Sequence, residues 1–174
     1  MRFWITLILL SVSLIATAGS GPFGLLIDKS RFADISNKYK LTFTQTLNVD
    51  NTSYTAYSFD EIKSLEFNGL DSGTLYFEKK TGVLKCVVLN INTHRYADIE
   101  SILSKKYKNV ERANTPLTDK YAIFEQGNTI IKLDAPVLNH VMRLIYINKD
   151  VYARLKRTDE KSEKELREEE AAKL

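Results

Sequence analysis

A motif that occurs twice constrains the fold of this chain more than any other feature of its sequence. The segment 31–36 (RFADIS) recurs as 95–100 (RYADIE), and each copy continues to a Lys-Tyr-Lys triplet. The second copy reaches its triplet four residues later, close to one helical turn, so its apolar residues stay in phase. We expect Asp28 and Asn92, at matched positions upstream, to act as N-caps. The spacing predicts two amphipathic helices, with apolar stripes formed by Phe32, Ile35, Tyr39, Tyr96, Ile99, Leu103 and Tyr107.

Strand patterns follow each predicted helix. Turn residues at 50–51, 80–82 and 127–128 separate short runs that are rich in β-branched and aromatic residues. The expected strands are 41–47, 54–59, 74–79 and 83–91 after the first helix, and 121–126, 129–133, 141–147 and 151–155 after the second. We therefore expect an α+β protein in which two tandem helix-plus-antiparallel-meander repeats form a two-layer sandwich, with a charged C-terminal helical tail.

The repeat also sets the expected domain organisation. Residues 19–91 are predicted to form the first α+β repeat and residues 92–155 the second, packed together as one domain. Residues 156–174 form a charged tail that is helical or disordered, with Glu163 and Arg167 among its i,i+4 pairs of opposite charge. The run 83–91 is apolar at both parities, which is typical of a central strand or of a junction between two halves. Most other strands alternate, so we expect one sheet face to stay open.

The N-terminus has the pattern of a cleavable signal peptide. Arg2 precedes an apolar run over 3–15, and Ala16-Thr17-Ala18 places small residues where a signal peptidase cuts. A membrane-spanning helix needs roughly 20 apolar residues, and this run is shorter. We predict residues 1–18 to be a signal peptide cleaved after Ala18, which sends the protein to the periplasm or outside the cell. No later segment of the sequence is long and apolar enough for a transmembrane anchor.

The sequence contains few residues suited to catalysis. Cys86, the only cysteine, excludes an internal disulfide and favours a bacterial periplasm, and it sits in the most apolar predicted strand. His94 and Asp98 offer two metal ligands where a site needs three or four, and His140 has no companion. Asp34 and Asp98 occupy equivalent positions in the two repeats. Acidic residues in the first turn of a helix interact favourably with the helix dipole, and this role fits the two residues better than a catalytic pair does.

A net charge of +3 gives no basic surface for nucleic acid. We expect no cofactor, no metal and no enzymatic activity.

Two segments suggest a resemblance. Residues 21–25 (GPFGL), and the Lys105–Lys108 end of the second helix with its following strands, resemble small, mostly uncharacterised periplasmic proteins of Gram-negative bacteria that begin with a PFGL segment. The duplicated layout is also similar to the two-layer fold of β-lactamase inhibitor proteins and of BamE-type outer-membrane assembly lipoproteins. This chain departs from both, because it lacks the disulfides of the inhibitors and the lipid-bearing cysteine of the lipoproteins.

These features favour a non-catalytic protein-binding module of the cell envelope, such as an inhibitor, immunity protein or assembly factor. The expected partner is another envelope protein, held on the open sheet face by Tyr54, Tyr57 and Tyr76. One alternative is a periplasmic carrier of a small ligand or lipid, with an apolar pocket between the helix layer and the sheet. Another is an enzyme that uses Cys86 with His94 or His140.

Overall fold

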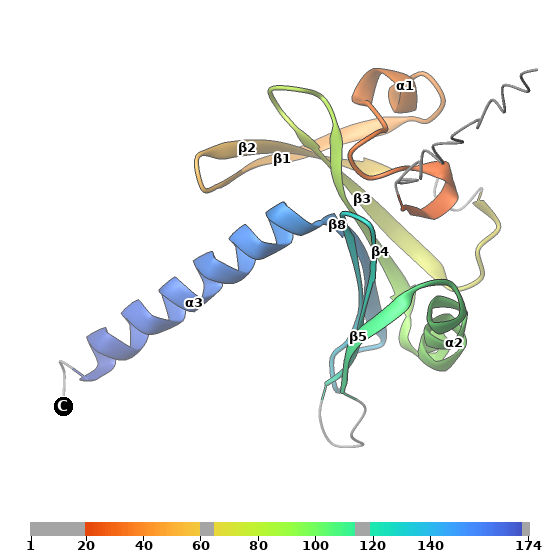
Figure 1. Ribbon diagram of the computed structural model, residues 1–174. Coiled ribbons are helices and arrows are strands. Elements are labelled where there is room, and N and C mark those ends of the chain that lie inside the picture. Colours follow the sequence, from red (N-terminus) through yellow and green to blue (C-terminus); the bar gives the residue numbers. More distant parts are fainter. Residues whose placement is uncertain (1–19, 60–64, 114–118, 172–174) are drawn as a thin grey trace, which may run out of the picture.

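One antiparallel β-sheet with helices on both faces forms the protein (Figure 1). The computed structural model describes residues 20–59, 65–113 and 119–171, and within them the sheet has eight strands in the order β1-β2-β3-β4-β8-β7-β6-β5. The predicted signal peptide lies outside the described residues. Along the chain the elements are η1 (Pro22–Gly24), α1 (Phe32–Ser36), β1 (Leu41–Val49), β2 (Thr52–Phe59), β3 (Leu70–Glu78), β4 (Leu84–Asn92), η3 (Thr93–Arg95), α2 (Tyr96–Lys106), β5 (Lys108–Ala113), β6 (Lys120–Gln126), β7 (Thr129–Ala135), β8 (Val141–Asn148) and α3 (Lys149–Ala171).

This single sheet corrects the expected fold of two tandem helix-plus-meander repeats in a two-layer sandwich. β4 and β8 pair antiparallel, from Cys86 opposite Ile147 to Asn92 opposite Val141. Both strands carry apolar residues on both faces, and such strands are stable only in the interior of a sheet. The two runs of four strands therefore merge edge to edge at β4 and β8 into one continuous sheet.

The main core lies on the inner face of the sheet, the face toward α1, α2 and the N-terminal segment (Figure 1). Alternate residues of the strands point to this face, among them Leu75 and Phe77 of β3 and Phe124 of β6, all nearly fully buried. α2 packs on β6 and β7 and buries Ile99 and Leu103. This layer is filled by side chains and positions the sheet whose other face forms the candidate site.

The first and third helices differ from the sequence-based expectation. α1 spans only five residues and ends at Ser36, with Asn37 as its C-cap, and Tyr39 then packs on Phe59 with ring centroids 4.8 Å apart. The predicted strand 151–155 is instead the first part of α3, since Asn148 accepts a hydrogen bond from the Val151 N–H at 3.0 Å. Val151 and Leu155, four residues apart, fit the helical period.

The sequence pattern missed β5 and misplaced one residue of β4. β5 is a charged edge strand whose one large apolar side chain, Val110, is 54% exposed, so it shows no buried alternation. In the β3–β4 pair, Leu84 lies opposite Phe77 and Cys86 opposite Tyr76, which leaves Lys85 as an extra residue. This bulge moves Leu84 to the inner face, whereas simple alternation places it beside Cys86.

Of the two expected N-caps, one is confirmed and one is wrong. The Asn92 side chain accepts a hydrogen bond from the His94 N–H at 3.2 Å and caps η3. Asp28 has a left-handed backbone with φ of 64°, and its side chain does not cap α1, whose N-cap residue is Arg31. The Asp28 carboxylate instead joins a polar cluster at the start of α3, described below.

Candidate functional site

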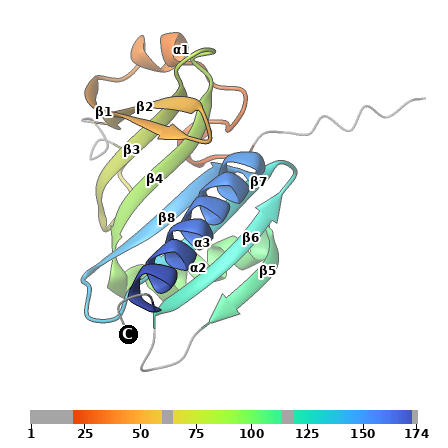
Figure 2. The ribbon, with the colours of Figure 1, turned by 90° about the vertical axis from the view of Figure 1, so that its left-hand side faces the viewer.

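A groove of about 460 Å³ lies between the outer face of the sheet and α3, and it is the candidate functional site. Figure 1 shows α3 starting at the end of β8 and slanting away from the sheet, and Figure 2 views the outer face with α3 in front. The groove is lined by Leu47, Val49, Tyr54, Tyr76, Lys85, Cys86, Val88, Lys132, Asp134, Arg143, Ile145, Ile147, Val151, Tyr152, Leu155, Lys156 and Asp159. Its volume is within the roughly 300–1,000 Å³ of typical ligand sites.

The floor of the groove is apolar near the start of α3. It consists of residues from β3, β4 and β8 that point away from the main core, chiefly Tyr76, Val88 and Ile145. These three are only partly buried, although each packs against a second apolar cluster that contains Cys86 and Ile147. Partly exposed apolar side chains in a concave surface lose their remaining contact with water when a ligand binds, which favours binding.

The walls of the groove come from two elements on opposite sides. α3 contributes Val151, Tyr152 and Leu155, and the β1–β2 hairpin contributes Leu47 and Val49. Two polar contacts join α3 to the hairpin. Arg154 donates a hydrogen bond to the Thr52 hydroxyl at 3.0 Å, and Arg157 lies 3.6 Å from the carboxylate of Asp50. The hairpin and the first turns of α3 therefore hold each other in place.

The other end of the groove is charged. Asp134 of β7 is largely buried and accepts a hydrogen bond from Arg143 at 2.6 Å, with the ammonium of Lys132 at 3.7 Å. From α3, Lys156 and Asp159 face the same space. One carboxylate shared by two cations leaves positive charge at this rim, and Arg143 is about half exposed. The groove thus changes from apolar to cationic along its length.

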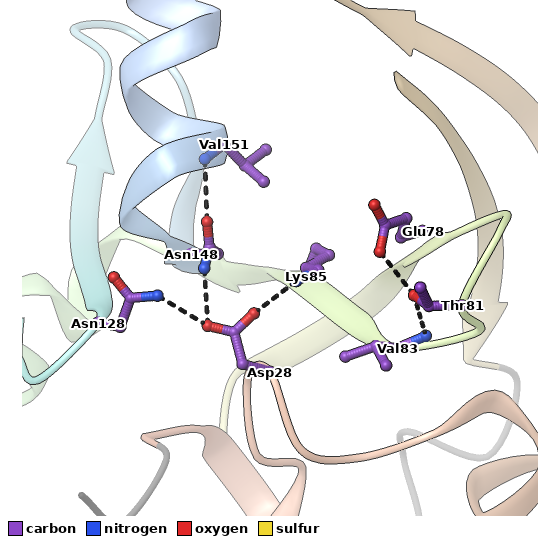
Figure 3. Close-up of polar contacts among 8 residues, drawn as sticks. All are labelled: Asp28, Glu78, Thr81, Val83, Lys85, Asn128, Asn148 and Val151. Atoms are coloured by element: carbon purple, nitrogen blue, oxygen red, sulfur yellow. Dashed lines mark hydrogen bonds and ion pairs between the residues drawn. The ribbon is translucent and has the colours of Figure 1, made fainter. Parts of the chain in front are cut away.

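A polar cluster around Asp28 holds the start of α3 on the sheet (Figure 3). The Asp28 carboxylate accepts hydrogen bonds from Lys85 at 2.9 Å, from Asn148 at 2.7 Å and from Asn128 at 3.1 Å. Asn148 in turn accepts the Val151 N–H that caps α3. The N-terminal segment, β4, the β6–β7 turn and α3 therefore meet at one carboxylate, which fixes where the helix leaves the sheet.

The three predicted binding tyrosines do not share one face. Tyr54 and Tyr76 line the groove, whereas Tyr57 points to the inner face and packs on Phe32, with ring centroids 4.7 Å apart. Burial raises the pKa of Tyr54 and of Tyr76 above the usual value for tyrosine, so both hydroxyls are neutral hydrogen-bond donors at physiological pH. Figure 2 shows the outer face on which Tyr54 and Tyr76 lie.

Cys86 lines the groove, but it is not placed for nucleophilic catalysis. Burial raises the pKa of its thiol to about 12, so the thiolate is scarce near neutral pH. His94 and His140 lie beyond the far end of the β4–β8 pair, which is roughly 20 Å along the strands from Cys86. Asp34 and Asp98 are exposed, and Asp98 pairs with Arg95 at 3.2 Å. Among the described residues, no three His, Cys, Asp or Glu side chains are grouped to hold a metal ion.

Sequence reasoning found part of this groove and missed its walls. The outward residues Cys86 and Val88 were visible in the doubly apolar run 83–91. The contribution of α3 was missed because 151–155 was interpreted as a strand, although its apolar residues at positions 151, 152 and 155 also fit one helix face. The charged rim had no sequence signal, since Lys132, Asp134 and Arg143 meet only through the β7–β8 pairing.

Comparisons with protein-family models, with curated proteins and with solved structures found no match to this chain. Within the described residues, no helix is long and apolar enough to cross a membrane.

Proposed function

We propose that this protein is a non-catalytic binding module of the cell envelope and that the groove between α3 and the sheet receives an apolar segment of a partner protein. The observation that carries the proposal is the apolar floor formed by Tyr76, Val88 and Ile145. These side chains are only partly buried, beneath a helix that slants away from the sheet. Export is supported by the signal-peptide pattern of residues 1–18.

A groove can receive a single anchor residue of a partner, and a flat surface cannot enclose one in the same way. Binding energy at protein interfaces concentrates in a few side chains that fill desolvated pockets. Tyrosine side chains line the groove, among them Tyr76 in the floor and Tyr152 in the α3 wall, and tyrosine provides both apolar area and a hydrogen bond at interfaces. The cationic rim at Arg143 then favours acidic residues beside the apolar anchor.

The layer between the helices and the sheet is a poorer site than the groove. It is the main core, packed with side chains such as Phe77, Phe124 and Met142, which are nearly fully buried. A ligand there would have to displace well-packed core residues, which costs more than filling an existing groove. We therefore place the site on the outer face instead of between helix layer and sheet.

A charge placed on the groove floor tests this proposal. Ile145→Lys puts an ammonium among Val88, Tyr76 and Leu155, and we expect it to weaken partner binding by roughly tenfold or more, since a buried unpaired charge opposes an apolar anchor. Ile102→Lys is the matched control, because Ile102 is 55% exposed on α2, which packs on the inner face.

The assay is site-specific photo-crosslinking in the cells that express the protein, with a photoreactive phenylalanine in place of Tyr152. A single crosslinked protein that disappears in Ile145→Lys and persists in Ile102→Lys supports the proposal. A crosslink that is equally strong in both variants shows that the partner does not enter the groove.

The cationic rim favours one second candidate, a carrier of amphiphiles with one apolar chain and an anionic head group. An apolar floor at Ile145 that leads to Lys132 and Arg143 matches such a ligand in polarity. A dansyl-labelled fatty acid is a suitable probe. Saturable fluorescence enhancement that is lost in Ile145→Lys, without a protein crosslink, would favour the carrier over the protein-binding module.

A further inference from the structure

The two edges of the sheet differ in their protection against strand pairing. β5 is a short edge with Lys108, Glu111 and Arg112. β1 is nine residues long and has no charged side chain, and all but its two terminal residues are exposed. Charged residues are one means by which a sheet edge avoids pairing with another strand, so β1 lacks a protection that β5 has.

The hairpin geometry shows which backbone groups of β1 face outward. Asp50 and Asn51 have φ of 44° and 61°, the conformation of a two-residue type I′ turn, so the flanking residues Val49 and Thr52 form a hydrogen-bonded pair. Ser53 is next, and its carbonyl accepts the Lys79 N–H of the adjoining segment at 2.9 Å, away from β1. Asn48, which lies opposite Ser53 on β1, therefore directs its backbone N–H and C=O outward.

The free part of the edge is the five-residue run 45–49. The pairing of β1 with β2 shifts between Phe43 and Gln45, and this bulge ends the regular edge on one side, as the turn does on the other. Within the run, Thr46 and Asn48 direct their backbone groups outward, because they alternate with the residues bonded to β2. Leu47 lies between them, 37% exposed, with its side chain on the outer face at the groove.

We propose that this edge pairs with the same edge of a second copy of the chain, antiparallel about a two-fold axis at Leu47. In this register Thr46 of one copy hydrogen-bonds with Asn48 of the other, and Gln45 lies opposite Val49. The two Leu47 side chains form the central pair, which is a non-hydrogen-bonded one. The two sheets become one.

The neutrality of β1 favours a second copy over another partner. A two-fold interface places each patch against itself, so any net charge on the strand would repel its own copy, and β1 has none. The central Leu47 meets an identical apolar side chain and loses its exposed area. Because Leu47 also lines the groove, pairing brings the two grooves side by side, although the pairing does not depend on what the groove binds.

Removal of one outward N–H tests the pairing. Thr46→Pro deletes a donor that β2 does not use, and proline is tolerated at such edge positions, so the hairpin is retained. Thr46→Val keeps the donor and is the matched control. In sedimentation equilibrium we expect dimers for the unaltered protein and for Thr46→Val, and a dissociation constant at least about tenfold higher for Thr46→Pro. A monomeric unaltered protein at all soluble concentrations, or an unchanged Thr46→Pro dimer, overturns the proposal.

A cysteine at the axis tests the register without removing a hydrogen bond. Facing residues of a non-hydrogen-bonded pair have Cα atoms about 4.5 Å apart, within the range of disulfides. Leu47→Cys should therefore form a disulfide-linked dimer on mild oxidation. Gln45→Cys should not, since its two copies would lie roughly 14 Å apart along the strands. Crosslinking of both variants to the same extent, or of neither, contradicts the register.

Discussion

Replacement of Asp28 by alanine tests whether one carboxylate holds α3 on the sheet. The substitution removes three hydrogen bonds, from Lys85, Asn128 and Asn148, and leaves the last two donors without this acceptor. It also puts an alanine at a left-handed position with φ of 64°. Glycine at the same position removes the same contacts but adopts this backbone freely, so the pair of variants separates the side-chain contribution from the backbone contribution.

The expected loss follows from these contacts. The two amide hydrogen bonds contribute about 1 kcal/mol each, and the Lys85 ion pair adds about 1 kcal/mol because both side chains are partly exposed. The left-handed backbone costs alanine about 1 kcal/mol more than glycine. Because Asp28 itself already carries a similar backbone cost, we expect Asp28→Ala to lower the free energy of unfolding by about 3 kcal/mol and Asp28→Gly by about 2 kcal/mol. Either loss is a large part of the 5–15 kcal/mol typical of a domain.

Urea unfolding followed by circular dichroism measures both values. If α3 detaches before the sheet unfolds, the helical signal at low urea should decrease in both variants while the sheet transition remains. A loss below about 1 kcal/mol for Asp28→Ala would falsify the assigned contacts. A glycine variant less stable than the alanine variant would refute the backbone argument but leave the contacts intact.

Two further predictions follow from single side chains. Burial raises the pKa of Cys86 from 9.0 to about 12, so its native thiol should react with iodoacetamide much more slowly than in urea. Equal alkylation rates for the native and the unfolded protein would contradict the burial of this thiol. Between pH 9 and pH 12 the thiol loses its proton in the unfolded state and keeps it in the folded state. The contribution of Cys86 to the free energy of unfolding should therefore decrease as the pH rises from about 9 to about 12. Asn148→Ala removes the cap of α3 and a donor to Asp28, and we expect it to cost about 2 kcal/mol in urea unfolding. Asn109→Ala on the exposed edge strand β5 is the matched control and should cause almost no change.

Many strands were predictable because their signals are local. Hairpin turns such as Gly127-Asn128, and alternation along β2 and β8, depend only on neighbouring residues. The doubly apolar run 83–91 likewise predicted an interior strand, and β4 is one. β5 has no such signal, because an exposed charged edge strand buries almost nothing.

The candidate site was only partly predictable. Tyr54 and Tyr76 lie on the groove face, but Tyr57 lies on the other face, since alternation along β2 separates residues 54 and 57. The wall formed by α3 was missed because a short apolar segment fits a strand or a helix equally well. A cap at Asn148 decides between these two, and its partner Asp28 is distant in sequence.

By itself the sequence determined the position of most strands and turns, the amphipathic α2, and the apolar character of the strand that became β4. These properties depend on backbone preferences and on side-chain periods within one segment. Only the tertiary structure decided that β4 and β8 join two meanders into one sheet, that Asp28 ties α3 to it, and that a groove remains between them. These features depend on contacts between residues far apart in the chain, whose free energy appears only when the segments pack together.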